Sequence, residues 1–137
     1  KNVMDAINPK LLWEIFKHIQ RWLANLNRAG EARQQQSRKA LRNVIIAARE
    51  TNVYVRQIQD TQQTDHATER HLAKCWTQLG FDLEDLRLNK LAKRCHINGK
   101  HWADPKFYSD DFLQKADISL ERMETLAKQI LLDIDKL

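Results

Sequence analysis

The stretch DDFLQKADISLERMETLAKQILLDIDKL, residues 110–137, decides the fold class of this chain. Its apolar residues recur at alternating steps of three and four: Leu113, Ala116, Leu120, Met123, Ala127, Ile130, Ile134 and Leu137. This spacing predicts a helix with a continuous apolar seam, as in a coiled coil. Phe112, Leu126 and Leu131 add a second apolar flank, which is typical of a central helix that touches several neighbours. A seam between the two chains of a homodimer is the alternative interpretation.

The sequence before this helix follows the same helical period. Apolar positions predict a first helix over 11–28, opened by Asn8-Pro9, and a second over 31–60. A broken pair of shorter helices, over 66–79 and 82–95, is expected to fill the remaining position of the bundle. The fold class predicted is therefore all-α, an antiparallel up-and-down bundle of four to five helices.

Local signals predict where the shorter helices start and stop. Gly80 is expected to end the helix over 66–79, and Asp82 to cap the next one. An acid and two apolar residues complete the pattern of a capping box with a hydrophobic staple: Asp85, Phe81 and Leu86. The pair Asn98-Gly99 predicts a turn, followed by an aromatic loop over 100–109.

Composition supports this architecture. The chain has 137 residues, three glycines and two prolines, too few turn residues for a sheet protein, and its length predicts one domain over 1–137. The two cysteines make no disulfide framework, which favours a cytoplasmic protein, and no apolar run is long enough for a membrane helix. No cofactor and no membrane partner are expected.

The two cysteines are the candidates for metal binding. His71 and Cys75 are four residues apart on a helix, and Cys95, His96 and His101 lie near the end of the next helix, which would return antiparallel. However, Cys75 falls on an apolar face, where a free cysteine usually packs as a small hydrophobic side chain. We therefore predict no metal site.

Basic residues provide candidates for nucleic-acid binding. The net charge is +5, and residues 1–60 carry 11 Lys/Arg against 5 Asp/Glu. Arg42, Arg49 and Arg56 are spaced by sevens and line one flank of a helix, while Lys93 and Lys100 lie in a stretch without acids. Binding through these residues would use phosphate contacts and would weaken with salt. A well-solvated surface is the alternative interpretation.

Arg94 and His101 are the candidate catalytic residues. They are separated by six residues, and this spacing resembles the Arg-x(4–6)-His signature of the HEPN ribonucleases. The resemblance implies a small helical bundle in which the arginine and histidine of two subunits meet and cleave RNA without a metal. A histidine can transfer protons near neutral pH, and an arginine can stabilise the charge on a phosphate.

The sequence lacks other signs of catalysis. It has no Gly-x-Ser-x-Gly motif and no glycine-rich phosphate loop. We therefore expect a non-catalytic protein-interaction or regulatory module, with a protein partner or a second copy as its ligand. The HEPN-like ribonuclease and a phosphate-contacting nucleic-acid binder remain as alternatives.

Overall fold

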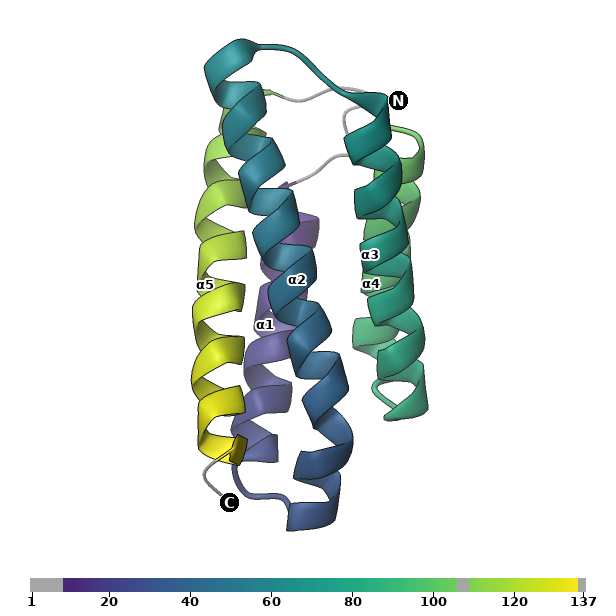
Figure 1. The fold of residues 1–137 in the computed structure, drawn as a ribbon, viewed down its shortest axis with the longest axis vertical. Helices are drawn as coiled ribbons and strands as arrows, with labels where there is room; N and C mark the ends of the chain where they lie inside the picture. The colour runs from purple at the N-terminus through teal and green to yellow at the C-terminus, as the bar shows by residue number, and fades with distance from the viewer. Residues whose placement is uncertain (1–8, 106–108, 136–137) are drawn as a thin grey trace.

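The chain folds into an up-and-down bundle of helices. The computed structural model describes residues 9–105 and 109–135, and within these ranges it contains five α-helices and no strand. The helices are α1 (Pro9–Leu26), α2 (Glu31–Thr61), α3 (His66–Asp85), α4 (Asn89–Ala103) and α5 (Asp110–Asp135). Consecutive helices run in opposite directions (Figure 1). The predicted all-α antiparallel bundle is confirmed.

The order of the helices around the bundle differs from their order in the chain. The packed pairs are α1 with α5, α5 with α2, α2 with α3, α3 with α4, and α4 with α1. Because the directions alternate along the chain, α1 and α5 are neighbours that run parallel (Figure 1). The helices α3 and α4 form an antiparallel hairpin on one side of the bundle, which α2 and α1 join to the rest.

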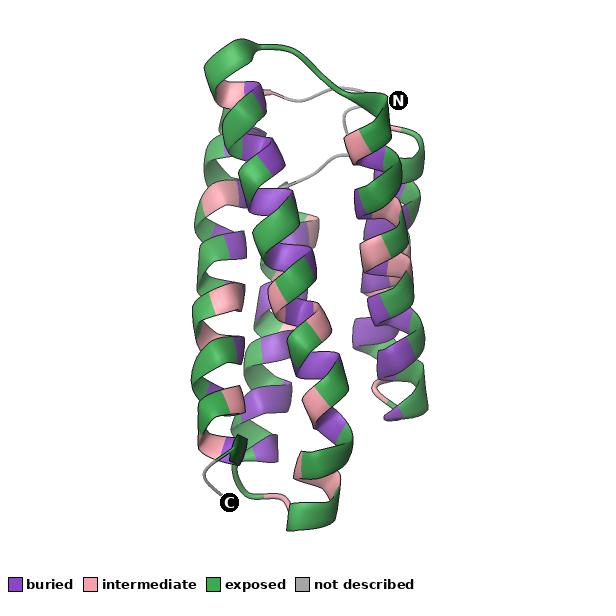
Figure 2. Cartoon of the chain, viewed as in Figure 1, coloured by how far each residue is buried: buried purple, intermediate pink, exposed green. Residues whose placement is uncertain are grey.

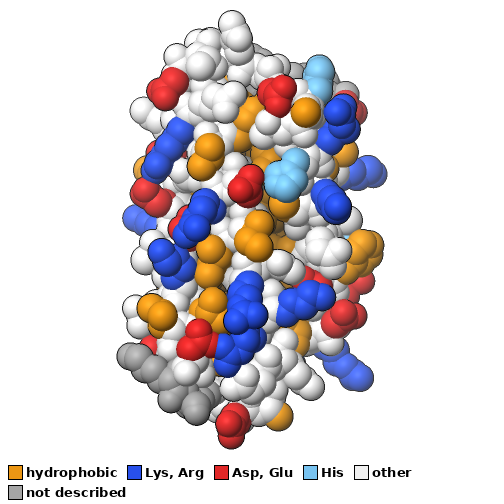
Figure 3. Space-filling view, in the orientation of Figure 1, with side chains coloured by type: hydrophobic (Ala, Val, Ile, Leu, Met, Phe, Trp, Pro, Cys, Tyr) orange, Lys and Arg blue, Asp and Glu red, His pale blue; other side chains and the backbone are white. Residues whose placement is uncertain are grey.

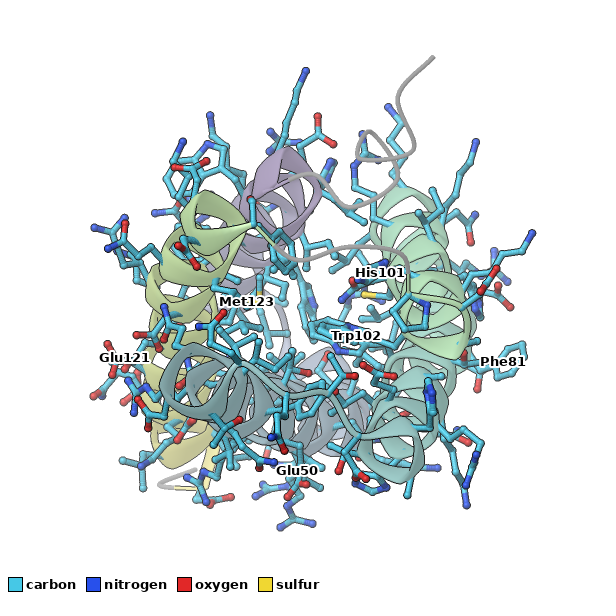
Figure 4. All side chains as sticks on the ribbon, turned by 90° about the horizontal axis from the view of Figure 1, so that it is seen from above. Glu50, Phe81, His101, Trp102, Glu121 and Met123 are labelled. Carbon is cyan, nitrogen blue, oxygen red and sulfur yellow. The ribbon has the colours of Figure 1, made fainter. Side chains whose placement is uncertain are left out.

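The apolar seam of α5 lies in the core of the chain itself. Its described positions are all buried: Leu113, Ala116, Leu120, Met123, Ala127, Ile130 and Ile134. Figure 2 shows the buried residues on the inward side of each helix, and Figure 4 shows Met123 pointing into the bundle. The seam thus belongs to the core of a single chain, but α5 packs against two helices, α2 and α1, and does not hold the predicted central position. The predicted cap Asn8 and the last seam residue, Leu137, lie outside the described residues.

The break between the two shorter helices lies at 86–88, and its predicted position at Gly80-Phe81 is wrong. The helix α3 continues through Gly80 to Asp85, and α4 continues through Asn98-Gly99 to Ala103. Asp82 is not a cap: it lies inside α3, is 8% exposed, and accepts hydrogen bonds from Asn43 of α2 and Gln78. The Asp82 carboxylate, which the sequence pattern predicts at a helix start, instead lies in the contact between α2 and α3.

Two of the glycines in these helices are sites of close packing. A methyl group at Gly99 would lie 2.5 Å from Thr77 Oγ1 and 3.1 Å from both Ala73 O and Thr77 N. A methyl group at Gly80 would lie 2.7–2.8 Å from the His96 ring. Neither glycine has a positive φ, so the backbone conformation does not require glycine at these positions. Their role is instead to allow α3 and α4 to approach each other closely.

Gly99→Ala is expected to lower the free energy of unfolding by about 1 kcal/mol. Overpacking against the fixed backbone of α3 costs about 1–3 kcal/mol, and the higher helix propensity of alanine returns about 1 kcal/mol. Chemical denaturation measures the change. Gly30→Ala is the control, because no atom lies within 4 Å of that position. Equal stability of the two variants would show that the backbones of α3 and α4 are not in contact at Gly99.

The actual turn between α3 and α4 is made without glycine or proline. Arg87 has φ 64°, the left-handed conformation. The Leu88 N–H donates to Leu83 O at 2.9 Å and the Arg87 N–H donates to Glu84 O at 2.9 Å. These two bonds form a Schellman motif, which satisfies the last carbonyls of α3 and turns the chain. An arginine in the position that usually favours glycine explains why the sequence pattern did not reveal this turn.

Candidate functional site

The predicted arginine flank of α2 is an ion-paired contact with α5. Arg49 donates to Glu124 Oε2 through Nε at 3.0 Å and Nη2 at 2.7 Å. Arg56 donates to Asp117 Oδ1 at 2.9 Å and to Glu121 Oε2 at 2.6 Å. Figure 3 shows basic and acidic side chains interleaved over these two helices.

These pairs change what the flank offers to a ligand. The hydrogen bonds to Glu124 and Glu121 raise the pKa of Arg49 and Arg56, so both side chains stay charged. However, each positive charge already faces a carboxylate of α5. Arg42 is exposed, and no other described residue forms an ion pair with it. The carboxylates of α5 occupy the Nε and Nη2 donors of Arg49 and Arg56 and offset their charge, so this flank favours helix packing over phosphate binding.

Arg94 and His101 both lie within α4, and not at a helix end followed by a loop as predicted. Seven positions apart, they are separated by about 10 Å along the helix axis. The Arg94 Nε lies 3.6 Å from Glu14 Oε1 of α1, and its Nη1 donates to Lys90 O at 3.3 Å. His101 is 9% exposed, with its ring against Trp102 and Phe112 at centroid distances of 4.8 and 6.3 Å. Figure 4 shows His101 and Trp102 on the inner side of α4.

The surroundings of His101 keep its imidazole neutral. Burial lowers its pKa to about 4, and the nearby Glu69 carboxylate only partly opposes this effect. Glu69 is itself 2% exposed and accepts a hydrogen bond from Tyr54 Oη at 2.6 Å. Burial, followed by this bond, raises the pKa of Tyr54. Within one chain His101 therefore packs as a core residue, and ribonuclease activity through Arg94 and His101 stays a prediction.

The thiols and histidines considered for metal binding are spread over the bundle. His71 Nε2 lies 3.5 Å from Cys75 Sγ and 3.5 Å from Glu50 Oε1, on the surface between α2 and α3. Cys95 is fully buried, and burial raises its pKa. Burial also raises the pKa of Cys75. The described residues contain no group of three or more His, Cys, Asp or Glu arranged to hold a metal ion.

The outer face of the α3·α4 hairpin combines exposed apolar side chains with basic ones. We call it the hairpin face and define it by Lys74, Phe81, Glu84, Lys93, His96, Ile97 and Lys100. Phe81 is 51% exposed and Ile97 is 45% exposed. Figure 4 shows Phe81 pointing away from the bundle. Large apolar side chains that gather on a surface commonly mark an interaction site.

His96 organises the centre of the hairpin face. Its ring packs edge-on against Phe81 at a centroid distance of 4.9 Å, and its Nε2 lies 2.9 Å from Glu84 Oε2. Hollows lie on both sides of it, one towards Phe81 and Lys74, the other towards Ile97 and Lys93. His96 is held above Gly80, which leaves room for the ring.

The lysines of the hairpin face differ from the arginines of α2. Lys93 and Lys100 are exposed on the same side of α4, and neither forms an ion pair with any residue that the structure describes. Lys74 on α3 is also exposed and without such a pair. Of the predicted nucleic-acid-binding residues, the structure therefore groups Lys93 and Lys100 beside exposed apolar side chains and places Arg49 and Arg56 in a contact between helices.

The sequence indicates the two lysines as binding residues, but it suggests a hydrophobic staple for Phe81 and a metal ligand for His96, and it gives Ile97 no role. The staple depends on Gly80, which predicts the end of a helix from its sequence position alone. Ile97 carried a usable signal, because it lies on the polar stripe of α4 between Lys93 and Lys100. An apolar residue in the middle of an otherwise charged stripe indicates a surface contact once the helix is known to continue.

Comparisons with known proteins give no relative. No protein-family model matches the chain, and neither a curated protein nor a solved structure is significantly similar to it. None of the helices in the described ranges is long and apolar enough to cross a membrane.

Proposed function

We propose that this chain is a non-catalytic protein-interaction module and that the hairpin face is its contact surface. The observation that carries the proposal is the exposure of Phe81 and Ile97 beside the lysines of the two hollows, Lys74, Lys93 and Lys100. When a partner covers an exposed aromatic or aliphatic side chain, the burial stabilises the complex by roughly 25 cal/mol per Å² of apolar area. Lysines around such a centre give a polar rim, which is the usual arrangement of a protein interface.

We also propose that the module acts in the cytoplasm. Both cysteines are free thiols, Cys95 fully buried and Cys75 partly so. Free thiols are typical of proteins that work in a reducing compartment.

Site-specific photocrosslinking in the cells that make the chain tests the proposed surface. A photoreactive amino acid is placed at Ile97 or Phe81, and at two control positions of similar exposure, Val53 (62%) and Ile118 (53%). We expect a discrete adduct with another protein from Ile97 and Phe81 but from neither control. Lys93→Glu with Lys100→Glu should reduce the adduct at least about tenfold, which corresponds to about 1.4 kcal/mol.

The nature of the adduct separates the alternatives. An adduct of twice the chain mass would make the partner a second copy. An adduct that is degraded by nuclease would show that the partner is nucleic acid and not a protein. Equal adducts from all four positions would show that the hairpin face is not a specific contact surface.

A further inference from the structure

We infer that the partner binds the hairpin face with a short amphipathic helix that carries Asp and Glu beside an apolar stripe. This inference rests on the proposed function and specifies the chemistry of the ligand. It draws on the shape of the face, the position of its apolar side chains and the sign of its charge.

The shape of the hairpin face fits a helix of about three turns. The two hollows beside His96 extend along α3 from Ala73 to Glu84. This span corresponds to about 16 Å of helix rise, or about three turns. The hollow nearer Ala73 is lined by small residues of both helices, among them Ala73, Thr77 and Ala103.

The apolar side chains of the face are placed for a ligand with a narrow apolar stripe. Phe81 and Ile97 stand on different helices, and both adjoin His96. A helix laid between them would bring one apolar side chain to each, spaced three or four residues apart on its own surface. Recognition of an amphipathic helix in a groove uses this spacing of anchors.

The positive charge of the hairpin face favours a ligand helix with acidic residues on both sides of its apolar stripe. Lys74, Lys93 and Lys100 line the hollows, and Glu84 is the only carboxylate among the described residues that line them. That carboxylate already faces His96 Nε2 at 2.9 Å. Carboxylates on both edges of a ligand helix would therefore meet ammonium groups that have no other partner within the described part of the chain. Complementary charge of this kind sets specificity and association rate.

An acidic helix fits this face better than nucleic acid does. Single-stranded nucleic-acid sites stack bases on aromatic or guanidinium planes, whereas the side chain between Lys93 and Lys100 is the aliphatic Ile97. The exposed aromatic side chain of the face, Phe81, is in contact with the His96 ring. The contact area of three helical turns is small, so we expect a transient complex with a Kd of about 1–100 μM.

Selection from a displayed library of random peptides of about sixteen residues tests this chemistry. The wild-type chain is the bait, and the Lys93→Glu/Lys100→Glu chain is the counter-selection bait. We expect the enriched peptides to share two apolar positions three or four residues apart with Asp or Glu beside them. A synthetic peptide of the consensus sequence is then measured by fluorescence anisotropy, and its helicity by circular dichroism.

Variants of the hairpin face are compared with matched variants on other helices. We expect Phe81→Ser/Ile97→Ser and Lys93→Glu/Lys100→Glu each to weaken peptide binding at least about tenfold. Val53→Ser and Lys128→Glu, which change exposed residues on α2 and α5, should leave it unchanged. All these positions are exposed, so unchanged circular dichroism and melting temperature are expected for every variant.

The failures are distinguishable. If the enriched peptides need Phe81 and Ile97 but carry no acidic residues, the inferred ligand is wrong and the proposed interaction module stands. If no enriched peptide needs Phe81 and Ile97, the proposed function is wrong as well. A single-stranded RNA or duplex DNA oligonucleotide is measured in the same assay. If it binds more tightly than any peptide, and if Lys93→Glu/Lys100→Glu abolishes that binding, the ligand of the hairpin face is nucleic acid and not an acidic helix.

Discussion

Trp76→Ala is expected to lower the free energy of unfolding by about 3–5 kcal/mol, the range for loss of a large aromatic side chain from a packed core. Trp76 is 1% exposed on α3, and its Nε1 donates to Thr51 Oγ1 of α2 at 2.8 Å. The alanine variant leaves a cavity and also leaves the Thr51 hydroxyl without this donor. Because Trp76 joins the α3·α4 hairpin to α2, the loss should appear as a lower denaturant midpoint in chemical unfolding.

Two further variants separate packing from hydrogen bonding at this position. Trp76→Phe keeps most of the apolar volume and removes the donor, so a smaller loss of about 1–3 kcal/mol is expected. Trp13→Ala is the control, because Trp13 is 41% exposed and should cost less than about 1 kcal/mol. Equal losses for Trp76→Ala and Trp13→Ala would contradict the described core.

The sequence was sufficient for those parts of the fold that depend on a repeating apolar pattern. Seven seam positions of α5 are buried, and α2 spans Glu31–Thr61 against a predicted 31–60. Helical periodicity determines which face is buried, so a helix with a long, regular seam can be placed from sequence alone.

The hairpin could not be predicted in the same way, because its signals have two physical meanings. A glycine can end a helix, or it can let two helices approach closely, as Gly80 and Gly99 do here. The choice depends on the residue opposite, which is known only when the partner helix is placed. Arg87, which makes the actual turn, has no sequence signature of a left-handed residue.

The candidate functional surface could not be predicted from the sequence for a similar reason. Whether an arginine is available to a ligand depends on which helix lies beside it, and only the order of helices around the bundle places the acids of α5 beside Arg49 and Arg56. Lys93 and Lys100 lie on a helix that packs between α3 and α1, and their side of it has no such neighbour among the described residues. Charge spacing alone does not distinguish these two cases.

Acidification from pH 6.5 to pH 4 is expected to reduce the stability of this protein by about 3 kcal/mol through His101 alone. Burial lowers the pKa of His101 from 6.5 to about 4. In this interval the unfolded chain binds a proton that the folded chain does not, so the free energy of unfolding falls as the pH falls. Below about pH 3 His101 is protonated in both states and its contribution stays constant.

His101→Gln tests this assignment, because glutamine is polar and does not titrate. Chemical denaturation of both proteins between pH 7 and pH 4 should give a clearly smaller slope of stability against pH for the variant. Other groups, such as Asp65, whose pKa is lowered by its hydrogen bonds to Thr68, contribute equally to both slopes. The comparison rests on the slope, so a constant loss of stability in the variant does not affect it. Identical slopes would mean that the pKa of His101 is the same in the folded and the unfolded chain, so that burial does not keep this imidazole neutral between pH 6.5 and pH 4.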